Sequence, residues 1–303
     1  MSDFRLKVFQ CVAKYKNFTT ASKELNISQP AVSKHIKELE EYYGIALFER
    51  GSNKIELTYA GEILLEYSNE ILSKYDTLLY TMHRLSNNDI GSIRIGASTS
   101  IAQYTLPQIL ADFNINYPNI KFSLISANSD TIEDLTQKRE IDIGMIEGCS
   151  KEHNLKYLPF LKDEIVAIAS EKNKRWEGVV PLEEIYKMPL VMREYTSGTY
   201  QVIEKALTDK GIDIRRLNIC ARMDSTESLK NYIQNSNYIG MFSIYAVQTD
   251  LYANKFHIID FDNMKIERNF SFVLPQSPLS SLQQLFISEI SKLVKHKYGK
   301  LGI

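Results

Sequence analysis

One stretch of the sequence places polar side chains that can read DNA on a single side of a helix. Gln29, Ser33 and Lys37 recur every four residues, a spacing that puts them on one helical face. Gln can pair in bidentate fashion with adenine, Ser can hydrogen-bond either type of base, and Lys can reach a guanine or a phosphate. Pro30 and Lys34 adjoin this face. The alternative is an ordinary solvated helix face, so the neighbouring elements must decide.

Those neighbouring elements favour DNA binding. Apolar spacing predicts three short helices and a small ribbon over residues 1–58. A short turn precedes the polar helix, which has Ser28 as its capping residue and Pro30 in its first turn. Gly44 ends this helix, and short strands over residues 46–48 and 55–57 surround a polar tip. The pattern is that of a winged helix-turn-helix domain.

A second group of polar residues could bind a small anion. Ser98, Thr99 and Ser100 follow a predicted strand and open a helix, and Thr196, Ser197 and Thr199 do the same further along the chain. Free N–H groups and the helix dipole make such N-termini favourable for anions. The alternative is that these hydroxyls only cap their helices. The two groups occupy matching positions, each between a predicted strand and a predicted helix, which favours a shared ligand site.

Glu147 follows another predicted strand and should face the same site. A carboxylate is unexpected beside a strongly anionic ligand. It could hold a protonated group of the ligand, orient a polar partner, or simply face solvent. The sequence leaves these three roles open.

A long helix is expected over residues 58–88. Its apolar residues form a narrow stripe close to a heptad seam: Ala60, Leu64, Tyr67, Ile71, Tyr75, Leu78, Met82 and Leu85. At 1.5 Å per residue such a helix is roughly 45 Å long, too long to bury its stripe inside the winged domain. We therefore expect pairing with a second copy of the chain rather than packing within one chain. Residues 59–90 are predicted to be a dimerisation helix and hinge.

After residue 91 short β-branched runs alternate with helical patterns, which predicts an α/β fold with largely parallel strands. We expect a two-lobed domain over residues 91–303, with one lobe formed by residues 91–162 and 265–303 and the other by residues 163–264. Strands are expected over residues 92–97, 120–125, 141–146, 164–169, 190–192, 217–221, 238–241, 257–259 and 266–274. Helices are expected over residues 101–113, 131–138, 200–208, 225–234 and 279–295.

Catalytic and metal sites find little support. The histidines are scattered, and the sequence contains no HExxH, GxSxG, P-loop or GxGxxG pattern in a suitable place. The three cysteines are far apart and form no CxxC pair. We predict no cofactor, no metal and no enzymatic activity.

Composition limits the partners. The 303 residues are 44% hydrophobic, with 36 Lys and Arg against 37 Asp and Glu, so any contact with nucleic acid must come from a local patch. No apolar run approaches the roughly 18 residues of a membrane span, and the first residues lack the pattern of a signal peptide. We expect a soluble cytoplasmic protein without a membrane partner.

The order of motifs resembles that of the LysR-type transcriptional regulators over the whole chain. The segments that carry the resemblance are Phe18-Thr19-Thr20-Ala21-Ser22-(x2)-Leu25, Ser28-Gln29-Pro30-Ala31-Val32-Ser33, Ile36-(x2)-Leu39-Glu40, Gly44-(x2)-Leu47-Phe48-Glu49-Arg50 and Leu57-Thr58-(x)-Ala60-Gly61. The resemblance implies a third helix in the major groove, a wing at the minor groove and a periplasmic-binding-protein-like effector domain of two Rossmann-like lobes. It also implies a homodimer or homotetramer on double-stranded DNA with an inverted repeat.

The resemblance assigns roles to individual residues. It implies base or phosphate contacts for Gln29, Pro30, Ser33 and Lys34, and a backbone contact for Arg50. The remaining predicted DNA-binding residues are Thr19, Thr20, Ser28, Lys37 and Lys54.

Two positions depart from the family pattern. Ser22 stands where a second alanine is usual, a change that the core should tolerate. At the wing tip Asn53 replaces a usual arginine, and Lys54 can substitute only as a point charge without the guanidinium fork.

The expected function is therefore that of a DNA-binding transcription regulator controlled by a small, anionic metabolite bound between the lobes. Residues 96–100 and 193–199 look like those of members tied to sulfur or carbon-fixation metabolism. The alternatives are a solute-binding protein and a small-molecule enzyme with a helical appendage.

Overall fold

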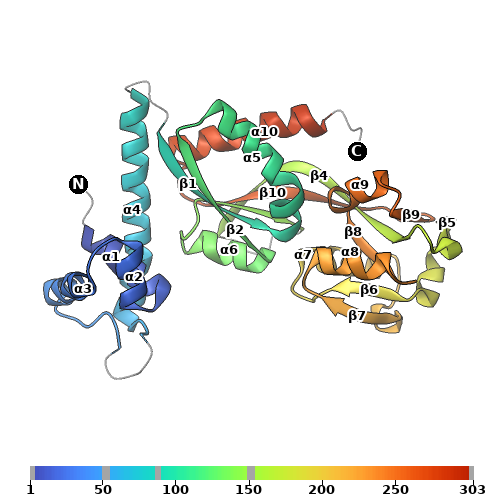
Figure 1. Ribbon diagram of the computed structural model, residues 1–303, viewed down its shortest axis with the longest axis horizontal. Coiled ribbons are helices and arrows are strands. Elements are labelled where there is room, and N and C mark those ends of the chain that lie inside the picture. The colour runs from blue at the N-terminus through green and yellow to red at the C-terminus, as the bar shows by residue number, and fades with distance from the viewer. Residues whose placement is uncertain (1–3, 50–54, 86–89, 149–153, 300–303) are drawn as a thin grey trace. The chain divides into compact units, whose positions relative to one another are not determined.

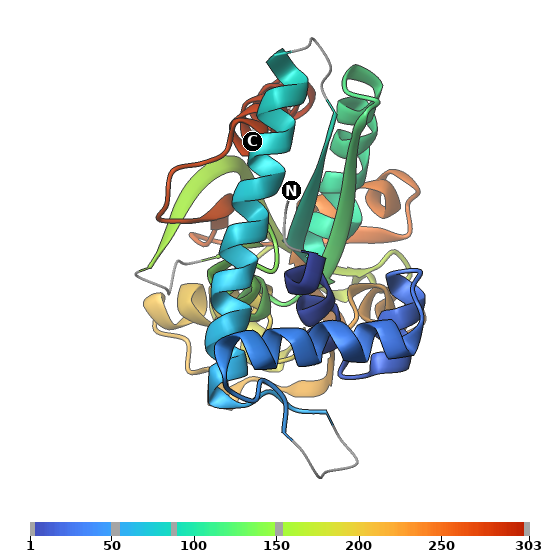
Figure 2. The ribbon, with the colours of Figure 1, turned by 90° about the vertical axis from the view of Figure 1, so that its left-hand side faces the viewer.

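The computed structural model describes residues 4–49, 55–85, 90–148 and 154–299, which form two compact units. The first unit contains α1 (Phe4–Tyr15), α2 (Phe18–Glu24), α3 (Gln29–Tyr43) and α4 (Tyr59–Leu85). The three short helices and the long helix are thus confirmed. α3 lies near the N-terminal end of α4 (Figures 1 and 2).

The core of the first unit is built from the apolar faces of its helices. Phe9, Val12, Val32 and Leu39 are almost completely buried, together with Leu47 from the segment after α3. Each such side chain contributes roughly 1.5–3 kcal/mol when it leaves water. This burial fixes which side of α3 faces inward, and so which side remains available to a partner.

Local capping sets the angle between α2 and α3. The Asn17 side chain accepts hydrogen bonds from the backbone N–H groups of Thr19 and Thr20, at 2.8 and 2.9 Å. Asn26 adopts a left-handed conformation with φ of 53°, and Ser28 then caps α3 by accepting from Ala31 N at 3.3 Å. Asparagine tolerates this backbone region better than most residues, so the turn is specified by its own sequence.

The segment after α3 is tied to the helices by a carboxylate and a glycine. Glu40 accepts a hydrogen bond from Leu47 N at 2.8 Å, and Phe48 pairs with Leu57 in an isolated antiparallel bridge. The two predicted strands are therefore reduced to this single bridge in the described residues, while the wing tip lies outside them. A Cβ atom on Gly61 would lie 2.2 Å from the Leu47 carbonyl oxygen, so α4 can start against this segment only with glycine there.

The apolar stripe of α4 divides into two parts. Ala60 and Leu64 pack against the core of the first unit. Beyond them, Tyr67, Ile71 and Leu78 are each about half exposed or more, as are Met82 and Leu85. The later part of the stripe is thus a row of apolar side chains on the surface of this chain.

The second unit is a mixed α/β structure around one sheet of ten strands in its described residues, and the predicted α/β class is confirmed. The expectation of largely parallel strands is wrong, because β4 and β10 run antiparallel to the strands beside them. The sheet order is β2-β1-β3-β10-β4-β8-β6-β7, with β9 paired to β4 and β5 paired to β9. The strands are β1 (Gly91–Ser98), β2 (Ile120–Ala127), β3 (Ile143–Glu147), β4 (Leu155–Ser170), β5 (Gly178–Val180), β6 (Leu190–Arg193), β7 (Ile219–Met223), β8 (Ile239–Ser243), β9 (Phe256–Phe261) and β10 (Ile266–Pro275). The helices are the π-helical turn η1 (Ile101–Thr105), the 3-10 turns η2 (Lys174–Trp176), η3 (Leu182–Lys187) and η4 (Ile214–Arg216), and α5 (Leu106–Asn116), α6 (Ser129–Gln137), α7 (Gly198–Asp209), α8 (Thr226–Gln234), α9 (Ile244–Tyr252) and α10 (Ser281–Tyr298).

Two long strands join the halves of this sheet. β4 pairs with β10 from Leu155 to Ile165, and then continues into pairs with β8. We call β1, β2 and β3 the first half and β6, β7 and β8 the second half. Helices α5 and α10 lie on one side of the first half and α6 on the other (Figure 1).

Several elements differ from the sequence-based expectation. β4 begins nine residues before the predicted strand at residue 164, and α9 was not predicted at all. The early part of β4 is half exposed and contains Pro159, so it lacks the apolar run of a buried strand. The α9 segment is apolar and directly follows β8, which hides the boundary between strand and helix.

Substitution of Gly61 by alanine tests the contact between α4 and the segment after α3. Because the added Cβ meets the Leu47 carbonyl oxygen, Gly61→Ala should lower the free energy of unfolding by about 1–3 kcal/mol. Urea unfolding of the full chain measures this change. Glu62→Ala, on the exposed side of the same turn, should have little effect, and equal midpoints for both variants would contradict the assignment.

Candidate functional site

The exposed face of α3 carries the residues predicted to touch DNA. Gln29 and Pro30 are exposed, Lys34 and Lys37 retain about three quarters of their side-chain surface, and Ser33 is half-buried. Gln29 Nε2 donates to Ser33 Oγ at 3.0 Å, so the two candidate base readers satisfy each other in the free chain. The face is polar, held by a rigid helix, and open to a partner.

The two lysines of this face make only exposed ion pairs with glutamates of the same helix. Lys37 lies 3.4 Å from Glu41 and Lys34 lies 3.9 Å from Glu38, each one helical turn along α3. Exposed pairs of this kind contribute little to stability, so a phosphate can replace the carboxylate at small cost.

The other predicted DNA-binding residues lie outside α3 itself. Thr19 and Thr20 are exposed at the start of α2, and Ser28 is exposed while it caps α3. Arg50 and Lys54 lie outside the described residues. Ser22 is buried and donates from its hydroxyl to Thr19 O at 2.9 Å, which explains why the core accepts serine in place of alanine.

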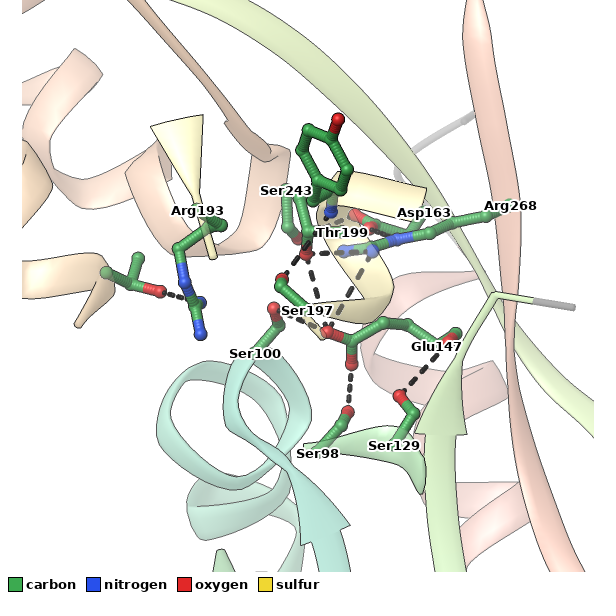
Figure 3. A network of polar contacts seen from close by, with 12 residues as sticks. Ser98, Ser100, Ser129, Glu147, Asp163, Arg193, Ser197, Thr199, Ser243 and Arg268 are labelled. Atoms are coloured by element: carbon green, nitrogen blue, oxygen red, sulfur yellow. Dashed lines mark hydrogen bonds and ion pairs between the residues drawn. The ribbon is translucent and has the colours of Figure 1, made fainter. Parts of the chain in front are cut away.

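A second polar cluster lies where the two halves of the sheet meet (Figure 3). Glu147, the last residue of β3, is 4% exposed. Its carboxylate accepts hydrogen bonds from Ser98, from Ser100 Oγ at 3.1 Å and from Thr199 Oγ1 at 3.4 Å. We call this set, with Ser129, Asp163, Ser243 and Arg268, the Glu147 cluster.

Arg268 links the cluster across the two long strands. Its Nη1 donates to Thr199 Oγ1 at 3.0 Å and lies 3.9 Å from Glu147, while its Nε donates to Asp163 at 2.7 Å. Ser243 Oγ donates to the other Asp163 oxygen at 2.7 Å. Burial raises the pKa of Asp163 above its usual range, Arg268 opposes this rise, and the nearby charge of Glu147 adds to it.

Close backbone packing brings the N-terminus of α7 to Glu147. A Cβ atom on Gly198 would lie 2.8 Å from Ser129 Oγ and 3.0 Å from the Glu147 carbonyl oxygen. Because glycine has no side chain, Thr199 can reach a carboxylate that belongs to the other half of the sheet.

The predicted ligand-binding residues occupy different places around this cluster. Ser98, Ser100, Glu147 and Thr199 are brought together in one network. Ser197 caps α7 by accepting from Tyr200 N, Thr99 is half-buried, and Thr196 is exposed. Ser100 makes no side-chain cap bond, so its hydroxyl is available to the cluster.

Sequence reasoning missed several members of the site. Ser129 opens α6 directly after β2, the same placement that drew attention to residues 98–100 and 196–199. Arg268 shares the buried face of β10 with Ile266 and Phe270, two residues away on either side, so a charged residue on the inward side of a strand was a usable signal. Asp163 offered no comparable pattern.

A second arginine at this edge of the sheet is already paired. Arg193, at the end of β6, is 7% exposed and holds Glu194 with two hydrogen bonds of 2.8 and 3.1 Å. Its Nη1 also donates to Thr226 Oγ1 at 2.8 Å. Nearby, the Tyr104 hydroxyl of η1 donates to Glu227 of α8 at 2.5 Å, which joins the two halves again.

Comparison with known proteins decides the family. Residues 4–62 match the family model described as bacterial regulatory helix-turn-helix protein, lysR family, and residues 86–294 match the LysR substrate binding domain. The chain belongs to the LysR family. It is a DNA-binding transcription regulator with an effector-binding domain.

Individual relatives agree with this membership. A probable RuBisCO transcriptional regulator of Phaeodactylum tricornutum is 30% identical over 95% of this chain and 96% of its own length. The structure of a full-length OxyR variant from Pseudomonas aeruginosa matches with a TM-score of 0.74, at 15% identity over 97% and 95% of the two chains. The regulatory domain of Synechocystis PCC6803 CcmR in complex with 2-PG matches with a TM-score of 0.62, at 24% identity over 68% of this chain and 98% of that domain.

Two other kinds of site are not found in the part of the chain that the structure describes. Within the described residues, no group of three or more His, Cys, Asp or Glu side chains is arranged to hold a metal ion. No helix in the same part of the chain is long and apolar enough to span a membrane.

The α3 face makes a prediction for this LysR-family chain. Gln29→Ala and Ser33→Ala should each cost about 1–3 kcal/mol on the specific operator, because each removes a base contact, and should cost little on random DNA. Gel-shift titration on an operator selected in vitro with the wild-type protein measures both. Lys34→Ala should instead weaken both kinds of binding, and equal losses on both DNAs for Gln29→Ala and Ser33→Ala would remove them as base readers.

Proposed function

We propose that the chain works as a homo-oligomer, built from dimers, that binds an inverted-repeat operator and responds to a small anion held between the two halves of its effector sheet. The observation that most directly supports this proposal is the Glu147 cluster, in which hydroxyls from both halves of the sheet donate to one carboxylate. We propose the domains as residues 1–58, 59–90 and 91–303, with lobes at 91–162 plus 265–303 and at 163–264. In this proposal the Glu147 cluster binds the effector and does not convert it chemically. The regulator acts in the cytoplasm.

The exposed part of the α4 stripe supports pairing. Ile71, Leu78 and Met82 are about half exposed at helical spacings of seven and four residues. A second α4 would remove these side chains from water and form the seam of a two-helix pair. Two-fold symmetry then places two α3 helices on related half-sites, about 34 Å or a multiple of it apart.

The position of the Glu147 cluster supports an effector site. Ligands of open α/β sheets bind beyond the carboxyl ends of the strands, and β1 and β3 end at Ser98 and Glu147. Ser100 directly precedes η1, and Thr199 lies in the first turn of α7. A protein of similar fold, the CcmR regulatory domain, was solved in complex with 2-PG.

A screen of small anions tests the effector assignment. Sulfate, sulfite, thiosulfate, phosphate and short carboxylates are added to the full chain, and thermal stability and operator affinity are measured. We expect one class to give a saturable shift of both, which Thr199→Val removes because it loses the hydroxyl that meets Glu147 and Arg268. Thr208→Val, exposed at the far end of the same helix, should respond as wild type does. A normal response in Thr199→Val would place the effector elsewhere.

Acidic substitutions on the apolar stripe of α4 test whether this face forms the interface between two chains. Ile71→Glu combined with Leu78→Glu should convert the chain to a monomer, because paired helices would bury like charges. Analytical ultracentrifugation measures the mass, and operator affinity should fall by well over tenfold as the second half-site is lost. Glu66→Ala, an exposed change on the same helix, serves as the control. An unchanged mass for the double variant would exclude this face as the interface.

A further inference from the structure

The anion-binding groups predicted from the sequence are occupied by the protein itself. Ser98, Ser100 and Thr199 all direct their hydroxyls at the carboxylate of Glu147. Figure 3 shows this carboxylate at the centre of the hydroxyls, with the guanidinium of Arg268 beside Thr199. The geometry is that of a bound carboxylate, except that the carboxylate is tethered to β3.

This occupancy conflicts with simple addition of an external anion. Glu147 and Asp163 place two carboxyl groups beside the single guanidinium of Arg268, and all three side chains are at most 4% exposed. A further anion would find the hydroxyls already bound to Glu147, and it would lie beside these carboxyl groups in a buried region where repulsion is weakly screened. An anionic effector can therefore enter these hydroxyls only if Glu147 leaves them.

One donor in the cluster points to a missing acceptor. Arg268 Nη2 is buried and, among the described residues, has no hydrogen-bond partner. The other two nitrogens of this guanidinium are satisfied by Asp163 and Thr199. A buried guanidinium N–H without an acceptor is costly, so an oxygen atom beyond those of the protein suits this position.

From these observations we infer that Glu147 is an internal stand-in for the effector: the effector's carboxylate, or an oxyanion of similar size, displaces the Glu147 carboxylate from Ser98, Ser100 and Thr199 and gains the free N–H of Arg268. The inference rests on the proposed function, since it concerns the same site. Glu147 thereby sets specificity, because a ligand must bind these groups better than a tethered carboxylate does. Displacement also breaks the Glu147–Thr199 hydrogen bond between the two halves of the sheet, so binding and rearrangement are one event.

Acetate is the probe that tests this exchange. In full-length Glu147→Ala the hydroxyls and Arg268 remain while the tethered carboxylate is gone, so acetate should bind at least about tenfold more tightly than to wild type. Calorimetric titration at constant ionic strength, with chloride as the balancing anion, measures this affinity. Adding Thr199→Val to Glu147→Ala should abolish the new site. Glu204→Ala, which removes a carboxylate on α7 outside the cluster, should bind acetate no better than wild type.

The outcomes separate the inference from the proposed function. Equal acetate affinity in wild type and Glu147→Ala would overturn the inference, even if the anion screen still finds an effector that depends on Thr199. A new acetate site in Glu147→Ala would support it, even if no anion alters operator binding by the wild type. If Glu147→Ala does not fold, Glu147→Gln gives the same test, because a neutral amide is displaced more readily than a carboxylate beside Arg268, and an acetate affinity equal to that of wild type again overturns the inference.

Discussion

The effector domain depends on satisfying buried carboxylates where two halves of one sheet meet. Glu147 and Asp163 are nearly inaccessible to water, and burial of an unpaired carboxylate is strongly unfavourable. Their donors come from β1 and the residue before η1, from α7, from β8 and from β10, which are four separate regions of the sequence. Each donor therefore also holds an element in place. Removal of one carboxylate would weaken the local packing and, at the same time, the connection between the halves.

The DNA-binding unit could be read largely from the sequence because its determinants are local. Asn17 and Ser28 cap helices two or three residues away, and the left-handed Asn26 forms the turn between them. The buried stripe containing Val32 and Leu39 leaves only one side of α3 for a partner. Short-range hydrogen bonds and helical periodicity determine the bounds and the exposed face of these helices, so they can be predicted without knowledge of tertiary contacts.

The Glu147 cluster could be predicted only in part, because its members meet through long-range pairing. The hydroxyls at Ser98, Ser100 and Thr199 were recognisable from their positions after strands, and Glu147 from the same rule. Their mutual hydrogen bonds depend on the register in which β4 crosses beside β10, which brings Asp163 opposite Arg268. No local pattern encodes that pairing. The sequence therefore left the role of Glu147 open, because the residues that contact its carboxylate lie about 50 or more positions away along the chain in either direction.

The two polar sites of the chain follow one physical design, in which the free protein satisfies its own binding groups. On α3 the exposed Gln29 and Ser33 share a hydrogen bond, which water or a base edge can replace at little cost. In the Glu147 cluster the same arrangement is buried, so the replacement must supply charge as well as geometry. A neutral ligand would leave Arg268 paired with Asp163 alone, and it would offer the hydroxyls of Ser98, Ser100 and Thr199 weaker acceptors than a carboxylate does. Under the proposed displacement of Glu147, burial makes the cluster selective for one class of ligand, whereas on the exposed face of α3 the sequence of the DNA determines selectivity.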